Sequence, residues 1–162
     1  MANTYSQIYI QFVFAVKGRQ NLIKKNFKDE LYKYISGITR NKKQKILEIN
    51  GMPDHVHMFI GLNPDVHISN LLKEIKSNSS RFINEKGFVK GKFSWQEGFG
   101  AFSYSHSHID KVVKYILNQE THHKKRTFKE EYLDLLEKFN VEYNPKYLFE
   151  FYDDLYAVPM EL

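Results

Sequence analysis

The feature that most constrains the fold of this chain is the order in which two hydrophobic periods follow one another. Side chains two apart share a face of a strand, whereas side chains three or four apart share a face of a helix. Residues 5–16 alternate with a period of two, and residues 27–38 then repeat apolar side chains at helical spacing. Strand patterns return at 45–49, 55–62 and 95–104, and helical patterns at 68–83, 109–117 and 128–139.

This order is the split β-α-β-β-α-β arrangement of ferredoxin-like and RRM-like domains. It predicts an α+β fold with an antiparallel sheet, helices on one face, and the other face available to a ligand or another layer. The segment 95–104 is aromatic and contains glycines, so we expect a bulge or bend in the last strand. With 42% hydrophobic residues, 1–162 is expected to form a single domain, of which about 128–162 is a C-terminal helical extension.

Charge and composition narrow the classes of function. The net charge of +5 and the pI of about 9.2 fit a polyanionic partner. Because the chain has no cysteine, any metal site must use histidine, carboxylate or amide ligands. No apolar run approaches the ~20 residues that cross a bilayer, and the N-terminus MANTYSQIYI lacks the features of a signal peptide. We therefore expect a cytoplasmic protein with no membrane segment.

Two histidines on the third strand pattern are the first candidates for chemistry. If Val56, Met58 and Ile60 face the helices, the pleat places His55 and His57 on the opposite face. Imidazole is a good ligand for first-row divalent ions, and two neighbouring rings supply two ligands. The alternative is a pair of solvent-facing histidines on an open sheet.

A tyrosine and a glutamine on the third helix pattern are the next candidates. Tyr115 and Gln119 are four residues apart, so they project from one face, and His122 falls on that face as well. Alternatively, Tyr115 is a core residue with a buried hydroxyl and Gln119 is an ordinary surface residue.

Taken together, these residues resemble a known family. Residues 52–60 (MPDHVHMFI) resemble the His-hydrophobic-His core of the HUH endonucleases. Residues 115–119 (YILNQ), followed by His122 and His123, resemble the nucleophile helix of the single-tyrosine, TnpA-type transposases of small bacterial insertion sequences. The resemblance covers roughly residues 5–125 and includes 14–19 (FAVKGR), 75–81 (IKSNSSR) and 95–102 (WQEGFGAF).

The resemblance implies an enzyme that nicks and rejoins single-stranded DNA to mobilise an insertion sequence. Tyr115 would attack a phosphodiester to form a 5′-phosphotyrosine and release a 3′-hydroxyl. His55, His57 and Gln119 would hold Mg²⁺ or Mn²⁺, and imidazole ligands favour manganese. Since a free tyrosine has a pKa near ~10, the phenol needs help to ionise. No small-molecule cofactor is implied, because the covalent intermediate retains the energy of the phosphodiester.

The resemblance also implies partners: single-stranded DNA with hairpin ends, and a second copy of the chain in a homodimer, in which Tyr115 acts in trans on the partner's histidine pair. Basic groups near 17–25, along 73–81 and at 124–126 are compatible with phosphate binding, although each also fits a solvated surface. The residues that we predict to contact DNA are Lys17, Arg19, Lys76, Arg81, His122 and Lys124.

Three further histidines are not assigned to the site. His106-Ser107-His108 lacks a hydrophobic centre and precedes the third helix, so we interpret it as a loop or cap, with Ser107 as a capping candidate. His67 is expected in a loop. Four other functions stay open: a non-catalytic RRM-like nucleic-acid-binding module, a replication initiator or relaxase of the HUH class, a domesticated HUH nuclease, and a small metal-dependent hydrolase.

Overall fold

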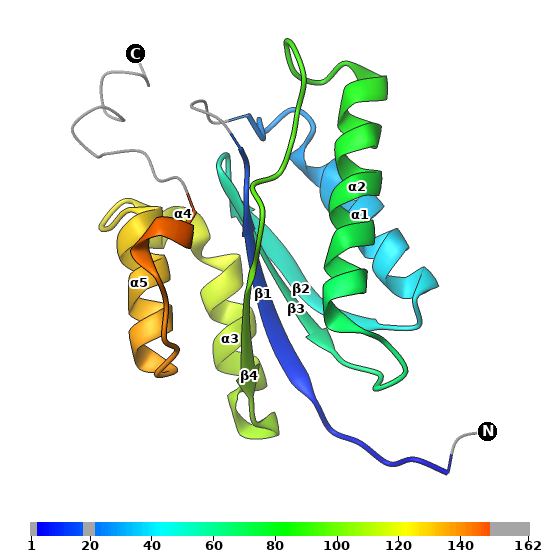
Figure 1. Cartoon of the computed structure of the whole chain (residues 1–162), viewed down its shortest axis with the longest axis vertical. Helices are drawn as coiled ribbons and strands as arrows, with labels where there is room; N and C mark the ends of the chain where they lie inside the picture. The colour runs from blue at the N-terminus through cyan, green and yellow to red at the C-terminus, as the bar shows by residue number, and fades with distance from the viewer. Residues whose placement is uncertain (1–2, 18–21, 150–162) are drawn as a thin grey trace.

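The computed structural model describes residues 3–17 and 22–149 of the chain. The order of elements confirms the predicted β-α-β-β-α-β arrangement, followed by helices (Figure 1). Two short 3₁₀ turns lie at His106–His108 and Pro145–Tyr147. The strands are β1 (Tyr9–Ala15), β2 (Lys45–Met52), β3 (His55–Gly61) and β4 (Gly100–Tyr104), and the α-helices are α1 (Lys28–Asn41), α2 (Ile68–Lys86), α3 (Ile109–Leu117), α4 (Gln119–His123) and α5 (Phe128–Lys138).

The four strands form one antiparallel sheet in the order β2-β3-β1-β4. The two central strands, β3 and β1, pair over seven positions, from Tyr9 opposite Gly61 to Ala15 opposite His55. A tight turn joins β2 to β3. Gly51, on β2 just before this turn, must be glycine, because a Cβ at this position would lie 2.1 Å from the carbonyl oxygen of His55. The histidine-bearing strand therefore lies in the middle of the sheet with its start fixed by this turn.

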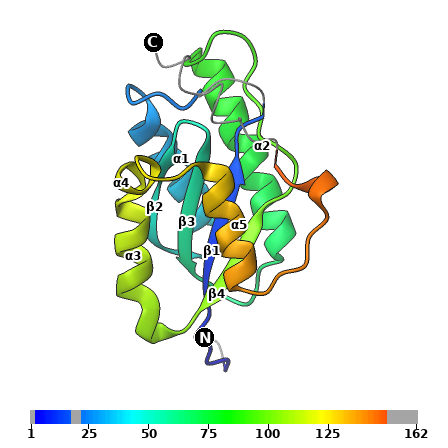
Figure 2. The same ribbon diagram turned by 90° about the vertical axis from the view of Figure 1, so that its left-hand side faces the viewer.

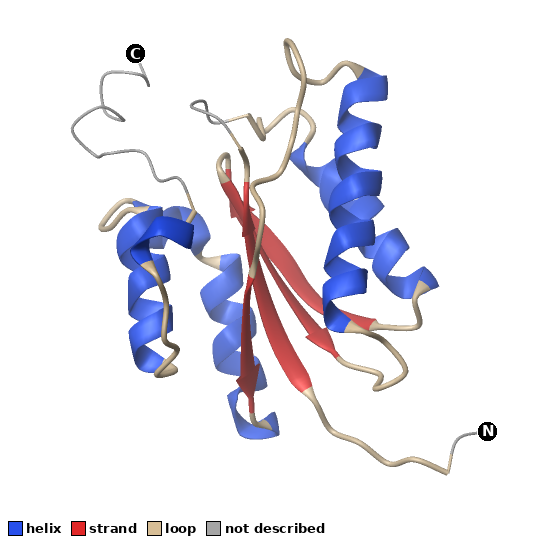
Figure 3. Cartoon of the chain, in the orientation of Figure 1, coloured by secondary structure: helices blue, strands red, loops and turns tan. Residues whose placement is uncertain are grey.

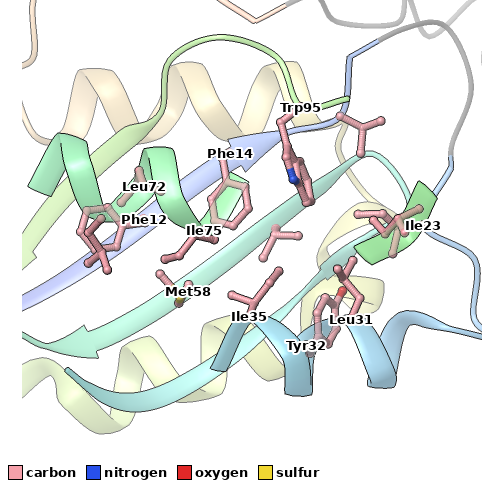
Figure 4. Packing of buried hydrophobic residues seen from close by; sticks show 14 of the residues in the cluster. Phe12, Phe14, Ile23, Leu31, Tyr32, Ile35, Met58, Leu72, Ile75 and Trp95 are labelled. Atoms are coloured by element: carbon pink, nitrogen blue, oxygen red, sulfur yellow. The ribbon is translucent and has the colours of Figure 1, made fainter. Parts of the chain in front are cut away.

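Helices cover both faces of the sheet (Figures 1 and 3). Helices α1 and α2 pack on one face and enclose a continuous apolar core, part of which Figure 4 shows. Helices α3, α4 and α5 lie over the other face (Figure 2). From the sequence, the second face of the sheet could hold either a ligand or another layer; in the structure it is covered by a layer of helices. The core side chains on the α1–α2 face that are labelled in Figure 4 are Phe12, Phe14, Ile23, Leu31, Tyr32, Ile35, Met58, Leu72, Ile75 and Trp95.

The fourth strand is shorter than the pattern at 95–104 predicts. Trp95 makes an isolated antiparallel bridge with Val16, and the strand itself begins only at Gly100. Between them, Gly98 adopts φ +82, which is strained for any residue with a Cβ. The glycine-bearing segment is therefore the predicted bend, and it separates the bridge from the strand.

The third helix also differs from the prediction, which placed Tyr115, Gln119 and His122 on one helix. Helix α3 ends at Leu117, and α4 begins at Gln119 after a turn at Asn118 (φ −93, ψ 24). The Nδ2 of Asn50, on β2, donates to the carbonyl oxygens of Ile116 and Leu117 at 3.0 and 3.2 Å. Because these carbonyls have lost their helical donors, Asn50 satisfies the end of α3 where the chain turns.

The C-terminal extension begins as a capped helix. Thr127 accepts a hydrogen bond from the backbone N–H of Glu130, whose carboxylate accepts one from the backbone N–H of Thr127. This capping box fixes the start of α5 as predicted near residue 128. The structure describes the extension as far as Phe149, and 150–162 lie outside the described residues. None of the described helices is long and apolar enough to cross a membrane.

Candidate active site

The two histidines of β3 lie on the sheet face under α3–α5, as the pleat predicts. Both side chains have 0% exposure, and their ring centroids are 5.0 Å apart. Phe128 of α5 stacks on His55 at 3.8 Å between ring centroids. The alternative of a solvent-facing pair is therefore wrong, because the C-terminal helices bury the pair that an open sheet would expose.

Each histidine has a partner that orients its ring. The Nδ1 of His55 is 2.7 Å from Oδ1 of Asp54, and the Nδ1 of His57 is 2.7 Å from Oε1 of Gln11. Gln11 presents its oxygen because its Nε2 donates to the hydroxyl of Tyr104 at 2.8 Å. When Nδ1–H of each ring is donated to its acceptor, Nε2 is left to face the other residues of the site. The same arrangement is found in protein metal sites, where the ring nitrogen that does not bind the metal is hydrogen-bonded to a neighbour.

Both predicted partners lie beside this pair, Tyr115 on α3 before the turn at Asn118 and Gln119 after it. Gln119 is fully buried, and its Oε1 lies 3.1 Å from Nε2 of His55. The ring of Tyr115 is half-buried, and its centroid lies 5.8 Å from that of His57. Four residues from three elements thus meet in one place, and the interpretation of Gln119 as a surface residue is wrong. The interpretation of Tyr115 as a core residue stays an alternative, because its ring also packs against the apolar cluster of Phe59, Val112 and Ile116.

A fifth residue, Glu131 of α5, lies at the centre of this group. It has 0% exposure, and its Oε1 is 3.2 Å from Nε2 of both His55 and His57. His123 also lies 2.9 Å from Oε1 through its Nε2. On the other side of the carboxylate, Oε2 accepts hydrogen bonds from Nε2 of Gln119, at 3.0 Å, and from the hydroxyl of Tyr115.

Sequence reasoning missed Glu131, although the sequence carries a signal for it. Glu131 stands three residues after Phe128 and four before Leu135, so it falls within the apolar stripe of α5. A charged residue at such a position must find a buried partner or stay out of the core. The position of Glu131 in the apolar stripe therefore predicts a buried partner for its carboxylate, but it does not identify the histidine pair as that partner.

The electrostatics of the group follow from this burial. Burial by itself would raise the pKa of the Glu131 carboxyl, but the facing His57 and the hydrogen bonds from His123 and His55 hold it well below its ordinary range. Burial also works against a charged His55, yet the adjacent Asp54 carboxylate raises the pKa of this histidine to about 9. For His57 burial dominates and lowers the pKa.

The nucleophile candidate is held in its protonated form in this arrangement. Burial and the adjacent Glu131 carboxylate raise the pKa of Tyr115 well above its ordinary value, while the nearby Arg126 acts in the opposite direction. The phenol therefore needs a further positive charge, from a cation or from a change in the position of Glu131, before it ionises.

The donor set fits a divalent cation. The ligand atoms of His55, His57 and Glu131 all lie within 4.8 Å of one another. In the neutral tautomer in which His57 donates Nδ1–H to Gln11, its Nε2 directs a lone pair at Oε1 of Glu131, so the two atoms can bind the same cation in place of a shared proton. The amide oxygen of Gln119, 3.1 Å from Nε2 of His55, adds a neutral ligand.

The predicted DNA-contacting residues are spread over the surface. Lys17, Arg81 and Lys124 are exposed, while Arg19 lies outside the described residues. Lys76 is engaged with the protein itself, since its Nζ donates to the carbonyl oxygens of Gln96, at 2.8 Å, and Gly98. Burial lowers the pKa of Lys76 to about 8. This lysine therefore ties α2 to the bend before β4.

The remaining histidines divide between the site and the rest of the fold. The ring of His122 lies 4.6 Å from that of Tyr115, and its Nε2 is buried with no hydrogen-bond partner among the described residues. His106 and His108 are exposed at the other end of α3, in agreement with their exclusion from the site. Ser107 is not the cap of α3, which starts after His108 without a side-chain cap. His67 instead caps α2, where its Nδ1 accepts from the backbone of Asn70.

A histidine pair thus lies on a central strand of the antiparallel sheet, beneath a helix that carries a tyrosine. The family is given by sequence: a family model described as Transposase IS200 like matches residues 4–119. The chain belongs to this family of IS200-like transposases. The match ends at Gln119, so Glu131 and α5 lie outside it.

Two solved structures share the fold. A protein from Deinococcus radiodurans R1, provisionally assigned as a transposase, aligns with a TM-score of 0.59 and 21% identity over 74% of this chain and 95% of that one. A REP-associated tyrosine transposase, solved bound to a REP hairpin, aligns with a TM-score of 0.57 and 18% identity over 94% of this chain and 93% of that one. A search of curated proteins gives no match.

Proposed function

We propose that this chain is a transposase that nicks and rejoins single-stranded DNA through a covalent bond to Tyr115, with a divalent cation held by the buried histidine pair. The observation that carries the proposal is the convergence of Tyr115 and both Nε2 atoms on a single carboxylate, that of Glu131. A nucleophile and a cation site so close together can act on the same phosphate.

His55, His57 and Glu131 would hold the cation, with Gln119 as a fourth ligand. When bound, the ion supplies Lewis-acid polarisation of the phosphate and orients the leaving oxygen. Mn²⁺ or Mg²⁺ fits the carboxylate and amide oxygens, and the two imidazoles favour Mn²⁺. The residues behind the ligands, Asp54 and Gln11, keep the imidazole rings in the orientation that binding requires.

Tyr115 would carry the covalent step. A bond forms between the phenolic oxygen and phosphorus, the bond from phosphorus to the 3′ oxygen breaks, and the proton lost by the phenol is balanced by the one gained at the 3′ hydroxyl. The reverse reaction on a second 3′ end restores a phosphodiester. Because the carboxylate of Glu131 has two oxygens, Oε1 faces the imidazoles while Oε2 accepts the phenol's hydrogen bond. Binding of a cation to Oε1 of Glu131 would therefore change the charge that the hydroxyl of Tyr115 faces at Oε2.

The proposed substrate is single-stranded DNA with hairpin ends, consistent with the hairpin in one structure of the same fold. Within this chain Tyr115 already lies over its own histidine pair, so the proposed chemistry needs no second copy. A homodimer in which Tyr115 serves the partner's histidines is the alternative arrangement. Mixing a Tyr115→Phe chain with a His57→Ala chain separates the two, because only the trans arrangement restores activity in the mixture.

An RRM-like binding module is not favoured by the geometry of the sheet. Such modules stack bases on an open sheet face. Here that face is covered by α3–α5, and its aromatic residue Phe59 has 0% exposure, packed against Val112 and Ile116.

The proposed function is tested by looking for a covalent adduct. The protein is incubated with Mn²⁺ or Mg²⁺ and labelled single-stranded DNA from the flanks of its own gene, and the products are separated on a denaturing gel. We expect a metal-dependent adduct that peptide mapping places on Tyr115 and that is absent in Tyr115→Phe. Tyr34→Phe, which changes a half-buried tyrosine of α1 on the other face of the sheet, is the control and should retain the adduct. Failure to form an adduct on any flanking strand would contradict the proposal.

A further inference from the structure

A cleft between α3 and α5 opens directly beside Tyr115. Its volume is about 660 Å³, within the range of about 300–1,000 Å³ that is typical of ligand sites. Tyr104, Val112, Tyr115 and Leu135 provide an apolar and aromatic lining, while charged side chains provide the remainder. The cleft is lined by Tyr104, Lys111, Val112, Tyr115, Arg126, Asp134, Leu135, Glu137 and Lys138.

The three basic residues that follow α4 differ in where they point. Lys124 and Lys125 are exposed. The side chain of Arg126 is only 29% exposed, and its Nη2 donates to the hydroxyl of Tyr115 at 3.4 Å. A guanidinium in contact with the attacking oxygen is within reach of the phosphate that this oxygen attacks, and its planar fork matches two phosphate oxygens.

The other end of the same guanidinium is paired with an acid. Nη1 of Arg126 donates to Oδ2 of Asp134, a residue of α5 whose side chain is 65% exposed. Because the Asp134 carboxylate is largely exposed, its pairing with Arg126 is screened by solvent, and an incoming phosphate can replace this carboxylate at small cost. Asp134 therefore occupies the position on Arg126 that a phosphate would take.

Resting on the proposed function, we infer that Arg126 is the residue that binds the scissile phosphate and that the cleft holds the adjoining nucleotide of the single strand. Exposed Lys111 and Lys138 line the same cleft and can contact flanking phosphates. The aromatic side chains of Tyr104 and Tyr115 offer surfaces against which an unpaired base can stack. The cleft also contains the carboxylates of Asp134 and Glu137, which limit its attraction for DNA until Asp134 is displaced.

The first test measures binding apart from cleavage. Fluorescence anisotropy follows a labelled 20-nucleotide oligothymidylate on the full chain in the Tyr115→Phe background, over a series of salt concentrations. Each phosphate contact on a single strand contributes about 0.7 to the slope of log affinity against log salt. Arg126→Ala should weaken binding about five- to tenfold near 0.1 M salt and lower the slope by about 0.7. Arg40→Ala, an exposed arginine at the end of α1, is the matched control and should leave both unchanged.

A second pair of variants predicts a change in the opposite direction, which a merely structural role for Arg126 would not give. Asp134→Asn frees the guanidinium and should tighten binding severalfold. Asp65→Asn removes the same charge from an exposed loop and should change binding much less. If Arg126→Ala keeps the slope of the parent, or if Asp134→Asn binds no more tightly than Asp65→Asn, the inference is wrong.

The covalent assay separates failure of this inference from failure of the proposed function. On a cleavable flanking strand, Arg126→Ala should slow adduct formation at least 100-fold, and Arg126→Lys, which keeps the charge but loses the fork, should recover part of the rate. A wild-type chain that forms no adduct contradicts the proposed function, whatever the binding result. Normal adduct formation by Arg126→Ala would leave the proposed function standing and overturn the role of Arg126.

Discussion

The two faces of the sheet are built from the same strands but differ in whether they bury ionisable side chains. On the face under α1 and α2, Met58 and its neighbours form a core of large apolar residues. On the face under α3–α5, apolar residues such as Phe59 are also buried, but they surround the equally buried polar and ionisable side chains of His55, His57 and Glu131. Burying ionisable groups costs free energy unless each is paired. The comparison indicates that one face holds the fold together and that the other is maintained for chemistry.

The polar face is completed by residues that are far apart in sequence. Asp54 and Gln11 orient the histidines, Asn50 holds the end of α3, and Glu131 comes from the extension. The apolar face instead depends on shape and volume, so conservative changes are tolerated there. Four substitutions, taken in decreasing order of predicted effect, test this difference between the two faces.

Tyr115→Phe should have the largest effect, and only on activity. We expect adduct formation to fall by more than about 10³-fold, because the attacking atom is gone. The free energy of unfolding should change by no more than about 1–2 kcal/mol, since the phenol contributes one hydrogen bond to Glu131. Chemical denaturation and the adduct assay measure the two quantities on the same preparation. A loss of stability larger than this would place Tyr115 with the structural face.

Met58→Ala should show the reverse pattern. This fully buried residue packs with α1 and α2, so its truncation should lower the free energy of unfolding by about 2–5 kcal/mol. Met58→Leu is the control and should cost less than about 1.5 kcal/mol. Below the unfolding transition, the adduct rate per folded molecule should be unchanged in both variants. A specific loss of that rate would mean that the two faces are not independent.

Glu131→Gln tests whether α5 contributes to the cation site. Removing one charged ligand should weaken Mn²⁺ binding about 10- to 100-fold by isothermal titration calorimetry. Glu137→Gln, on the exposed side of the same helix, should bind Mn²⁺ like the parent. Equal affinities in all three proteins would remove Glu131 from the site and leave it as a structural partner of the histidines.

Asn50→Ala should have the smallest effect. Loss of the hydrogen bonds to the end of α3 should lower the free energy of unfolding by about 1 kcal/mol. The adduct rate should fall severalfold, because Tyr115 stands on the last turn that Asn50 holds. Lys45→Ala, at the exposed start of the same strand, provides the baseline for both measurements. An adduct rate equal to this baseline would show that Asn50 does not position the nucleophile.

Much of the fold and part of the site could be predicted from the sequence. The period-two pattern separated His55 and His57 from Val56 and Met58, because a pleat permits no other assignment. The break at Asn118 could not be predicted, since nothing in helical spacing distinguishes a continued helix from one whose end is held by a distant side chain. Glu131 was missed for the same reason: its helix was predicted, but the place where that helix docks depends on tertiary contacts. The single-domain organisation stays a prediction.

The most direct test of the central claim is a crystal structure grown with Mn²⁺ and measured at the manganese absorption edge. We expect one anomalous peak about 2.2 Å from Nε2 of both His55 and His57 and from an oxygen of Glu131, with Asp54 and Gln11 still bound to the far ring nitrogens. A structure in which Glu131 keeps its direct contact with both imidazoles, with no anomalous peak between them, would contradict it.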